Sequence, residues 1–410
     1  MAASVAYVMA FSLATMLVRR QNCRLARLRD EGVVGGTTTQ CEQSSEGGGR
    51  NRFLVLYPAY KEDAVIVHSV TTFLEQDYPK ELYEVVVISD NMRKETNEAL
   101  ASLGVTVLEP SFEKSSKAKA LQYAIGNSSF ATNVLNYTDG NLKSYVIIMD
   151  ADNVVSSDFL RLLSASCSEG HLAIQCHRTA KNADNDIAVL DGVSEEINNS
   201  IFRRGHNAVG LSSALIGSGM CFDYHWFADH VGELSTAGED KELEAMLLKE
   251  RVFIKYEADI YVMDEKVSGS DNFERQRLRW MTAQVQCLVS MLPYVPKAIA
   301  TGNMNYIDKT VQQALIPRSI LLVLIPVMIV LTGVVGIVGR HWEFWWVVGK
   351  WVLLLIVLLG ALLIAIPKNM RKWSVLSKAM RVPRLASKMM KNVVRINTRN
   401  KEFLHTEHGR

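Results

Sequence analysis

The sequence predicts an α/β domain that is built on a mostly parallel sheet and attached to membrane-spanning helices. Buried-type strands alternate with helical segments between residues 52 and 149, which is the pattern of parallel strands joined by right-handed crossovers. Three long apolar segments lie outside that region, one before it and two after it. No G-x-G-x-x-G follows the first strand, so the pattern does not favour a dinucleotide-binding Rossmann domain.

Composition narrows the function classes. The chain has 410 residues, enough for one large α/β domain with attached helices. Its net charge of +2 lacks the basic excess of a nucleic-acid-binding protein, so we expect no nucleic-acid partner. The six cysteines are scattered without a C-x-x-C pair or a Cys/His cluster. This favours a reduced compartment and disfavours a zinc site.

The three apolar segments predict membrane helices at 1–18, 319–339 and 344–366. The first two carry no charged side chain, and the third carries only Lys350. The last two runs are long enough to cross a bilayer, and the first is at the short end of that range. Tryptophans gather near the tight turn between the last two segments, as in an interfacial belt. The alternative is a buried helical hairpin in a soluble core, which fits uncharged runs of this length poorly.

Charge beside these segments predicts their orientation. An arginine cluster follows the first segment, and residues 368–410 contain twelve Lys/Arg and two Glu. Because positive flanks favour the cytosolic side, we expect an integral plasma (inner) membrane protein whose catalytic domain is cytosolic. In the basic tail, 367–410, apolar side chains interleave with cations, which indicates an amphipathic segment lying on the bilayer.

The predicted domain, residues 52–292, begins after a Gly/Ser/Thr/Gln-rich stretch. Together with the arginines before it, this stretch indicates a basic, flexible linker at 19–51. Apolar runs rich in Val and Ile predict strands, and amphipathic stretches between them predict helices. In the first half we expect strands at 52–60, 84–90, 105–108 and 145–149, and helices at 63–76, 94–103 and 118–125. Gly104 suits the C-terminal cap of the second helix.

The second half of the domain has a mixed pattern. We expect a strand at 171–178, a helix at 188–204, a Gly-rich loop at 216–220, a helix at 241–250, a long strand or strand pair at 252–262 and a helix at 272–292. Residues 293–318 then form an interfacial segment before the second membrane helix.

Carboxylates follow two of the predicted strands. Asp90 ends the second strand, and the Asp-Ala-Asp sequence at 150–152 follows the buried run at 145–149. In open α/β sheets ligands collect outside the carboxyl ends of the strands, and paired carboxylates there can hold a hard divalent cation against a diphosphate. The alternative is that Asp152 or Asn153 caps a following helix.

Two further patterns carry chemistry. Glu239 and Asp240 open a predicted helix, where acids either favour the helix dipole or serve as a catalytic base. Residues 276–280 have the form Q-x-x-R-W. Gln276 and Arg279 are three residues apart and share a helix face, and a guanidinium suits phosphate oxygens. The alternative is an amphipathic helix with a snorkelling Arg and a core Trp.

The order of these motifs resembles that of the membrane-embedded family-2 inverting glycosyltransferases of the GT-A fold. Cellulose, chitin, hyaluronan and poly-N-acetylglucosamine synthases belong to that group. The resemblance covers roughly residues 52–292 and the membrane topology, and the combination of motifs is more specific than Q-x-x-R-W alone. It implies a GT-A catalytic domain and a nucleoside-diphosphate sugar, such as a UDP-sugar, as donor.

The resemblance implies a role for each motif residue at the donor. Asp152, with Asp150, would hold Mg²⁺ or Mn²⁺ against the diphosphate. Asp150 is also implied to contact the nucleotide, and Gln276 and Arg279 to hold the diphosphate. The loop at 58–62 resembles the family's P-x-Y-N-E sequence, with Lys61 in place of Asn, which leaves one nucleotide contact in doubt. The remaining implied donor contacts are Pro58, Tyr60, Glu62, Asp90, Lys117 and Lys119, with Lys117 preferred over Lys119.

The resemblance also assigns the acceptor side. Asp240 is implied to be the base that deprotonates the acceptor hydroxyl, with Glu239 shaping or supporting it. Trp280 offers a flat surface for a sugar ring, and the loop Gly217, Ser218 and Gly219 would let the acceptor approach the backbone.

The chain departs from the large processive synthases in two ways. It has fewer membrane helices, so a homo-oligomer or an export partner would have to complete a channel. Their gating sequence, F-x-V-T-x-K, is not intact, and the nearest stretch is 373–378.

We therefore expect an inverting hexosyltransferase that acts at the cytosolic face of a lipid bilayer. It would move a sugar from a UDP-sugar to a growing polysaccharide or a lipid-linked saccharide and form a β-linkage. One alternative is a non-catalytic membrane subunit that scaffolds a synthase or export complex. A transporter component is another, but it leaves the aspartate motifs unexplained. The sugar, its linkage and the choice between Mg²⁺ and Mn²⁺ do not follow from these motifs.

Overall fold

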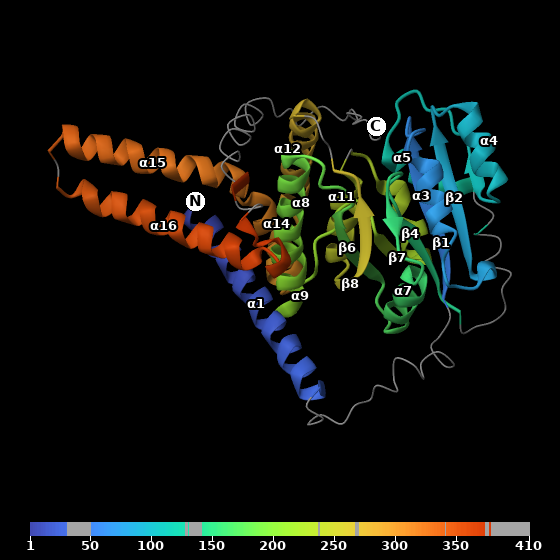
Figure 1. The fold of residues 1–410 in the computed structure, drawn as a ribbon, viewed down its shortest axis with the longest axis horizontal. Helices are drawn as coiled ribbons and strands as arrows, with labels where there is room; N and C mark the ends of the chain where they lie inside the picture. Colours follow the sequence, from blue (N-terminus) through green and yellow to red (C-terminus); the bar gives the residue numbers. More distant parts are fainter. Residues whose placement is uncertain are drawn as a thin grey trace.

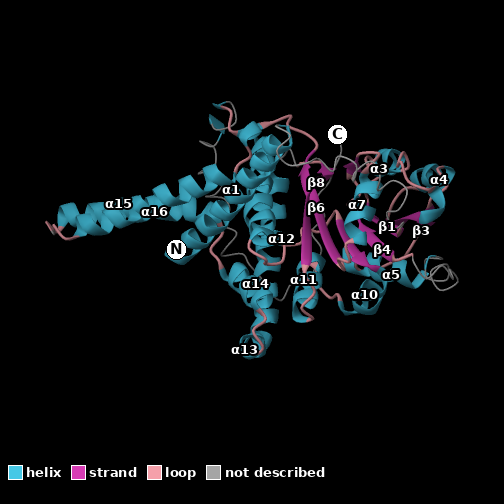
Figure 2. Ribbon diagram, turned by 90° about the horizontal axis from the view of Figure 1, so that it is seen from below, coloured by secondary structure: helices cyan, strands magenta, loops and turns pink. Residues whose placement is uncertain are grey.

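The computed structural model describes residues 1–30, 51–127, 130, 142–236, 238–266, 270–340, 342–373 and 377–378. In these residues one mixed sheet contains eight strands in the order β3-β2-β1-β4-β7-β6-β8-β5. The strands are β1 (Arg52–Tyr60), β2 (Tyr83–Asp90), β3 (Thr106–Leu108), β4 (Ser144–Ile148), β5 (Val154–Val155), β6 (Ala173–Ala180), β7 (Met220–Asp223) and β8 (Ile254–Asp264). Helices cover both faces of the sheet, as Figures 1 and 2 show.

The longer helices include those expected from the sequence, with ends that differ, and three that were not expected, at 159–168, 224–230 and 304–314. They are α1 (Ala2–Asp30), α3 (Ile66–Phe73), α4 (Lys94–Ser102), α5 (Lys117–Asn127), α7 (Phe159–Ser168), α8 (Asp186–Asn198), α10 (Tyr224–His230), α11 (Glu239–Lys249), α12 (Ser270–Met291), α14 (Met304–Ala314), α15 (Arg318–Val338) and α16 (Phe344–Ala365). Shorter turns of helix are η1 (Lys80–Leu82), η2 (Asn199–Gly205), α9 (His206–Ala208), η3 (Val231–Glu233), η4 (Leu292–Tyr294), α13 (Val295–Ala300) and η5 (Lys368–Met370).

The first half of the domain is a parallel α/β unit. β1 pairs in parallel with β2 on one side and with β4 on the other. Successive residues of each strand alternate between the two faces, so Phe53 and Val55 pack in one core and Leu54 and Leu56 in the other. Both cores are fully buried at these strands. This explains why the sequence shows continuous apolar runs here instead of an alternating pattern.

The second half is mixed, because β7 runs antiparallel to both β4 and β6. In the described residues four of the seven strand pairings are parallel and three are antiparallel. The prediction of a mostly parallel α/β sheet is therefore confirmed. Parallel strands with their carboxyl ends at one edge bring the loops after β1, β2 and β4 together.

A helical layer separates the sheet from the apolar helices. In the described residues, α1, α15 and α16 contain the segments long and apolar enough to cross a membrane. α15 and α16 form an antiparallel hairpin that projects away from the sheet, and α8 stands between this hairpin and the sheet (Figure 1). The buried side chains Val5, Ile197, Leu321 and Leu358 join α1, α8, α15 and α16 in a third apolar cluster.

The outer part of the hairpin is apolar and exposed. Val330, Ile337 and Trp346 are 63, 66 and 78% exposed. Each such side chain gains roughly 1.5–3 kcal/mol when it leaves water, so this surface suits a bilayer. The three expected membrane helices are thus present as candidate spans.

The structure differs from the sequence expectations at the linker. α1 continues through Asp30, so the part of the expected flexible linker at 19–30 is helical, because its arginine-rich sequence contains no helix breaker. Residues 31–50 lie outside the described residues, as does nearly all of the expected basic tail. The expected interfacial segment, 293–318, consists mainly of η4, α13 and α14.

Candidate active site

A cavity of about 970 Å³ runs from the carboxyl ends of β1, β2 and β4, past α11 and α12, to the apolar helices. Most of the residues singled out in the sequence line it. They are Pro58, Tyr60, Glu62, Asp90, Lys117, Asp150, Asp152, Gly217, Glu239, Asp240, Gln276, Arg279 and Trp280. Motifs spread over more than 200 residues of sequence therefore meet in one place.

The loops after β1 and β2 form one wall of the cavity. Tyr60 pairs in parallel register with Asp90, and the backbone N–H of Lys61 donates to the Asp90 carbonyl at 3.2 Å. Lys61 has a positive φ of 56°, which turns the chain sharply after the strand. Asp90 is 3% exposed, and its carboxylate accepts from the Asn91 side chain at 2.8 Å.

Asp150 follows β4 and lies between two cations. Its carboxylate pairs with the ammonium of Lys117, and the Arg178 guanidinium is 3.8 Å away. Lys117 also donates to the Gly217 carbonyl at 2.6 Å and lies 3.5 Å from Glu239. Burial lowers the pKa of Lys117, but Asp150 and Glu239 outweigh this, and the net shift is upward. Lys117 is therefore a fixed positive charge inside a group of acids.

Asp152 is held from the opposite side. It is 5% exposed, and one carboxylate oxygen accepts from the backbone N–H of Glu265 at 2.7 Å. The Asn153 amide donates to the other oxygen at 3.2 Å. α7 begins only at Phe159, with Asp158 as its N-cap, so Asp152 does not cap a helix. The hydrogen bond from Glu265 holds this carboxylate against the loop after β8, and Asp152 lines the cavity.

The acidic pair opens α11 and faces the cavity. Glu239 is 7% exposed. Burial raises the pKa of Glu239 to about 7; Lys117 opposes the rise and Asp240 adds to it. The Asp240 carboxylate accepts from the backbone N–H of Lys241 at 2.9 Å. The pair occupies the first turn of the helix and also lines the cavity, so the two positions expected for these acids are compatible.

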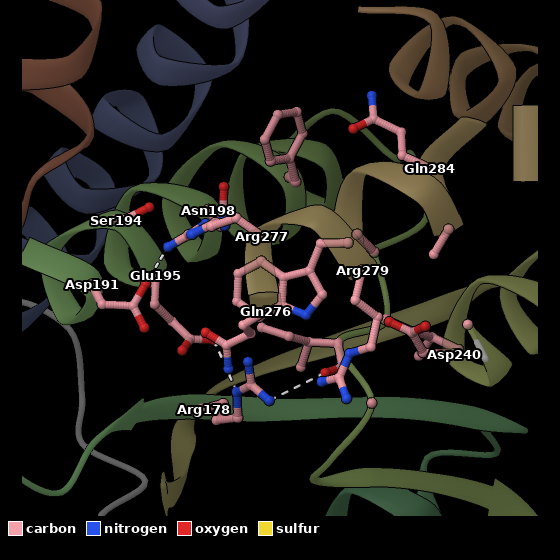
Figure 3. Close-up of a pocket in the computed structure, with 18 of the residues that line it drawn as sticks. Arg178, Asp191, Ser194, Glu195, Asn198, Asp240, Gln276, Arg277, Arg279 and Gln284 are labelled. Carbon is pink, nitrogen blue, oxygen red and sulfur yellow. Dashed lines mark hydrogen bonds and ion pairs between the residues drawn. The ribbon is translucent and has the colours of Figure 1, made fainter. Parts of the chain in front are cut away.

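The Q-x-x-R-W segment lies on α12, opposite the acidic pair. In Figure 3, Arg279 extends toward Asp240, while Arg277 turns the other way and pairs with Asp191 of α8. The two arginines diverge because residues two apart on a helix do not share a face. The Arg277 guanidinium also stacks over the Trp280 ring at 4.5 Å from its centroid. The Gln276 side-chain oxygen is buried with no hydrogen-bond partner in the described structure.

A buried ion network lies beneath the loops after β1, β2 and β4, and it was not predicted from the sequence. The guanidinium of Arg178 (β6) lies 3.0 Å from Glu195 (α8) and 3.4 Å from Asp264 (β8). Lys266 pairs with the same two acids. Burial raises the pKa of Asp264 to about 6 against the pull of Lys266 and Arg178. One usable signal was present in the sequence: the expected strand 252–262 is followed by a carboxylate, Asp264, as the expected strand 84–90 ends on Asp90.

Three expected site residues lie elsewhere. Lys119 is exposed, and its ammonium donates to the Lys114 carbonyl at 2.7 Å; two residues from Lys117 on α5, it points away from the cavity. Ser218 and Gly219 are not among the cavity-lining residues. Ser218 is fully buried. A Cβ at Gly219 would lie 2.9 Å from the Val262 side chain, so this glycine serves close packing against β8. Of the three loop residues expected at the acceptor side, only Gly217 lines the cavity.

Comparison with known proteins identifies the family. The model described as "Glycosyltransferase like family 2" matches residues 51–283. Two curated relatives, the beta-monoglucosyldiacylglycerol synthases of Trichormus variabilis and of Nostoc sp., are each 27% identical over 230 residues, which are 55% of this chain and 47% of theirs. The chain thus spans about half the length of the curated relatives it matches.

Two solved structures are similar to the chain at low scores. The mannosyltransferase PcManGT from Pyrobaculum calidifontis, in complex with GDP-Man and Mn²⁺, matches with a TM-score of 0.46 and 14% identity, over 88% of this chain and 98% of that one. S. aureus TarS 1–349 in complex with UDP-GlcNAc matches with a TM-score of 0.43 and 14% identity, over 84% and 88%.

The family assignment rests on the sequence match, which covers more than half of the 410 residues. The mixed sheet and the acidic loops after its parallel strands agree with it. The chain belongs to the glycosyltransferase-like family 2, and its domain is built on a mixed α/β sheet.

Proposed function

We propose that the protein is a membrane-bound, inverting glycosyltransferase that uses a nucleoside-diphosphate sugar, in the first place a UDP-sugar. The observation that carries the proposal is the meeting of Asp90, Asp152, Asp240 and Arg279 in one cavity. A non-catalytic scaffold would not require all these charged side chains to face the same space.

The donor would bind at the acidic end of the cavity. Asp90, Tyr60 and Glu62 line the wall where the nucleotide would lie. Arg279 offers a guanidinium for the diphosphate oxygens. Asp150 is engaged by Lys117 and Arg178, which favours a positioning role for it near the nucleotide.

A divalent cation fits this end of the site. No group of three or more His, Cys, Asp or Glu in the described ranges is arranged to hold a metal alone. Mg²⁺ at phosphate sites, however, is bound through one or two carboxylates, with phosphate oxygens and water completing the shell. Asp152, with Asp150 beside it, would supply the carboxylates for Mg²⁺ or Mn²⁺. Such an ion would neutralise the charge that develops on the leaving diphosphate.

Transfer would proceed by a single displacement. The acceptor hydroxyl oxygen attacks the anomeric carbon while the bond from that carbon to the diphosphate breaks, and the nucleoside diphosphate leaves with the electron pair. Asp240 takes the hydroxyl proton, as a general base must. Glu239 and Lys117 set the local charge around Asp240. An α-linked donor would yield a β-linked product.

The orientation follows from the same proposal. Nucleotide sugars would reach the catalytic domain from the cytosol, in agreement with the arginines at the end of α1 and the basic C-terminal region. The acceptor would be a saccharide or a lipid at that membrane face.

The test is nucleotide release by the detergent-purified full chain. UDP should be released from one member of a UDP-sugar panel in the presence of Mg²⁺ or Mn²⁺, and chelation should stop it. The matched pair of variants is Asp240→Asn in the site and Asp229→Asn on the exposed side of α10. The proposal fails if no donor of the panel is consumed, or if Asp240→Asn and Asp229→Asn behave alike.

A further inference from the structure

The end of the cavity farthest from the donor loops is lined by apolar side chains. Leu355, Leu359 and Leu362 of α16 recur at spacings of three or four residues and line it, as does Ile366 directly after the helix. Such a spacing places the three leucines on one face of the helix. Val8 of α1 and three apolar residues of α8, Leu190, Val193 and Ile197, also line this wall, which we call the apolar end. A cavity used only by sugars and nucleotides would have no need of it.

The apolar end opens on the outside of the molecule. Leu359 and Leu363 both line the cavity, yet they are 50 and 48% exposed. They lie within α16, whose sequence is long and apolar enough to cross a membrane. The mouth of the cavity therefore faces the region that the bilayer would occupy, and a hydrocarbon chain can pass from the bilayer into the cavity without crossing water.

A cation that forms no ion pair with any carboxylate of the described residues marks the boundary between the apolar end and the polar site. Arg318 lines the cavity at the first turn of α15. Its guanidinium donates to the Asn198 side-chain oxygen at 2.7 Å and to the Ser194 carbonyl and hydroxyl at 2.6 and 2.8 Å. All three partners are neutral, and among the described residues no carboxylate lies within ion-pair distance of Arg318.

Neighbouring arginines add to the excess of positive charge at Arg318. Arg203 and Arg277 lie close enough to Arg318 to repel it, and Arg277 already shares the charge of Asp191. Figure 3 shows Ser194 and Asn198 on the same stretch of α8 as Asp191. Buried charges are ordinarily paired. An anion bound here would complete the set, and a guanidinium fork matches the oxygens of a phosphate.

These observations lead to one substrate class. We propose that the acceptor is a membrane lipid with a phosphate in its headgroup and a free hydroxyl beyond it. The phosphate pairs with Arg318, the hydrocarbon chain lies against α16 in the apolar end, and the hydroxyl reaches toward Asp240. This proposal rests on the proposed function, because it names the acceptor of the same reaction.

The reaction then has a definite balance. The lipid hydroxyl oxygen forms the new bond to the anomeric carbon, the bond from that carbon to the diphosphate breaks, and the hydroxyl proton goes to Asp240. The products are a glycosylated phospholipid and a free nucleoside diphosphate. The lipid phosphate is unchanged and keeps its charge on Arg318.

The test uses the full chain reconstituted in phosphatidylcholine vesicles with one hydroxyl-bearing lipid added. Dioleoyl phosphatidylglycerol has the phosphate, and dioleoylglycerol has the same chains without it. Glycerophosphoglycerol, which has the headgroup and no chains, tests the apolar end. We expect phosphatidylglycerol to be glycosylated with a kcat/KM roughly 10–100-fold above that of dioleoylglycerol, the factor that 1.5–3 kcal/mol from a charged hydrogen bond supplies. Equal or better use of dioleoylglycerol or of glycerophosphoglycerol would overturn the proposal.

Variants locate the two halves of the lipid site. Arg318→Gln should raise KM for phosphatidylglycerol about tenfold or more with little change in kcat, and Arg318→Lys should restore part of the loss. Leu359→Trp should narrow the mouth and raise KM for the lipid. Ile356→Trp, on the exposed side of α16 outside the cavity, should not. An equal effect of the two Trp substitutions would place the lipid elsewhere.

The outcomes separate this proposal from the proposed function. If the reconstituted chain releases UDP but glycosylates neither lipid, the transferase activity stands and the acceptor class is wrong. If no UDP is released with any lipid present, the proposed function itself fails.

Discussion

The two ends of the cavity differ in charge and in origin. The donor end is rich in acids that come from the loops after parallel strands, such as Asp90, Asp150 and Asp152. The apolar end is lined by apolar side chains of α8 and α16, and Arg318 of α15 lies at its boundary with the polar site. The acidic donor end needs an added cation before it can hold a diphosphate, whereas Arg318 can hold an anion directly.

This contrast teaches how one cavity can serve two substrates. The donor end belongs to the sheet, whose strand ends fix the loops between two buried cores. The other end is built where helices of the domain meet candidate membrane spans. Changes at the donor end should therefore alter chemistry or donor binding, and changes at the membrane end should alter acceptor binding.

The largest effect is expected at Asp240. Asp240→Asn removes the proposed base and should lower kcat about 10²–10⁴-fold, while UDP affinity measured by calorimetry stays the same. The exposed Asp229→Asn is the control. If Asp240→Asn retains full turnover, the base is another group. A collapse with Glu239→Gln in its place would move the role to Glu239.

The substitution Asp152→Asn tests whether the donor end of the cavity is the metal site. Loss of one carboxylate should lower transfer on the order of 100-fold, at the upper end of what disturbing a metal's surroundings costs. UDP affinity should also lose its dependence on Mg²⁺ or Mn²⁺, which titration with and without the ion measures. Asp158→Asn, in the next loop turn and outside the cavity, should keep that dependence. Unchanged metal dependence in Asp152→Asn would contradict the assignment.

Glu239 gives a pH-dependent prediction for the ligand-free protein. Its pKa is raised by burial to about 7, above the roughly 4.3 of an exposed Glu. The folded state therefore holds a proton that the unfolded state releases, and stability falls as pH rises from about 4.5 to 7. The substitution Glu239→Gln removes this pH-dependent loss of stability.

The difference should appear in thermal unfolding at several pH values. Glu239→Gln should gain up to about 3 kcal/mol relative to the wild type between pH 5 and pH 8, as the size of the pKa shift implies. A constant difference across this range would mean that Glu239 titrates normally.

The smallest effect is expected at Lys119, which the structure separates from Lys117. Lys119→Ala should change stability by less than about 0.5 kcal/mol and leave the donor KM unchanged. Lys117→Ala should raise the donor KM, because it removes the cation between Asp150 and Glu239. Equal donor effects of the two substitutions would contradict the geometry of α5.

Residues at the donor end could be predicted from the sequence because the ends of strands can be recognised in it. Apolar runs that stop on a carboxylate predicted where Asp90 and Asp152 lie, and helical spacing predicted that Gln276 and Arg279 face the same cavity. The order of the strands in the sheet could not be predicted, because β7 lies antiparallel between β4 and β6 and no local sequence pattern indicates this position.

The rest of the site could not be predicted from the sequence, for physical reasons. Gly219 and Ser218 belong to a chain that enters the core at β7, so packing against Val262 decides their surroundings. Arg178 and Glu195 form a network through tertiary contacts between a strand and a helix far apart in sequence. Arg318 marks the start of an apolar helix, and only the fold shows that it faces a cavity.

The most direct test of the central claim is mass spectrometry of the lipid and soluble fractions after the reconstituted chain meets a mixed pool of UDP-sugars. The account predicts a new product carrying added hexosyl on a membrane component, formed with divalent metal and absent with Asp240→Asn. Nucleotide release without any glycosylated product, or the same product from Asp240→Asn, would contradict it.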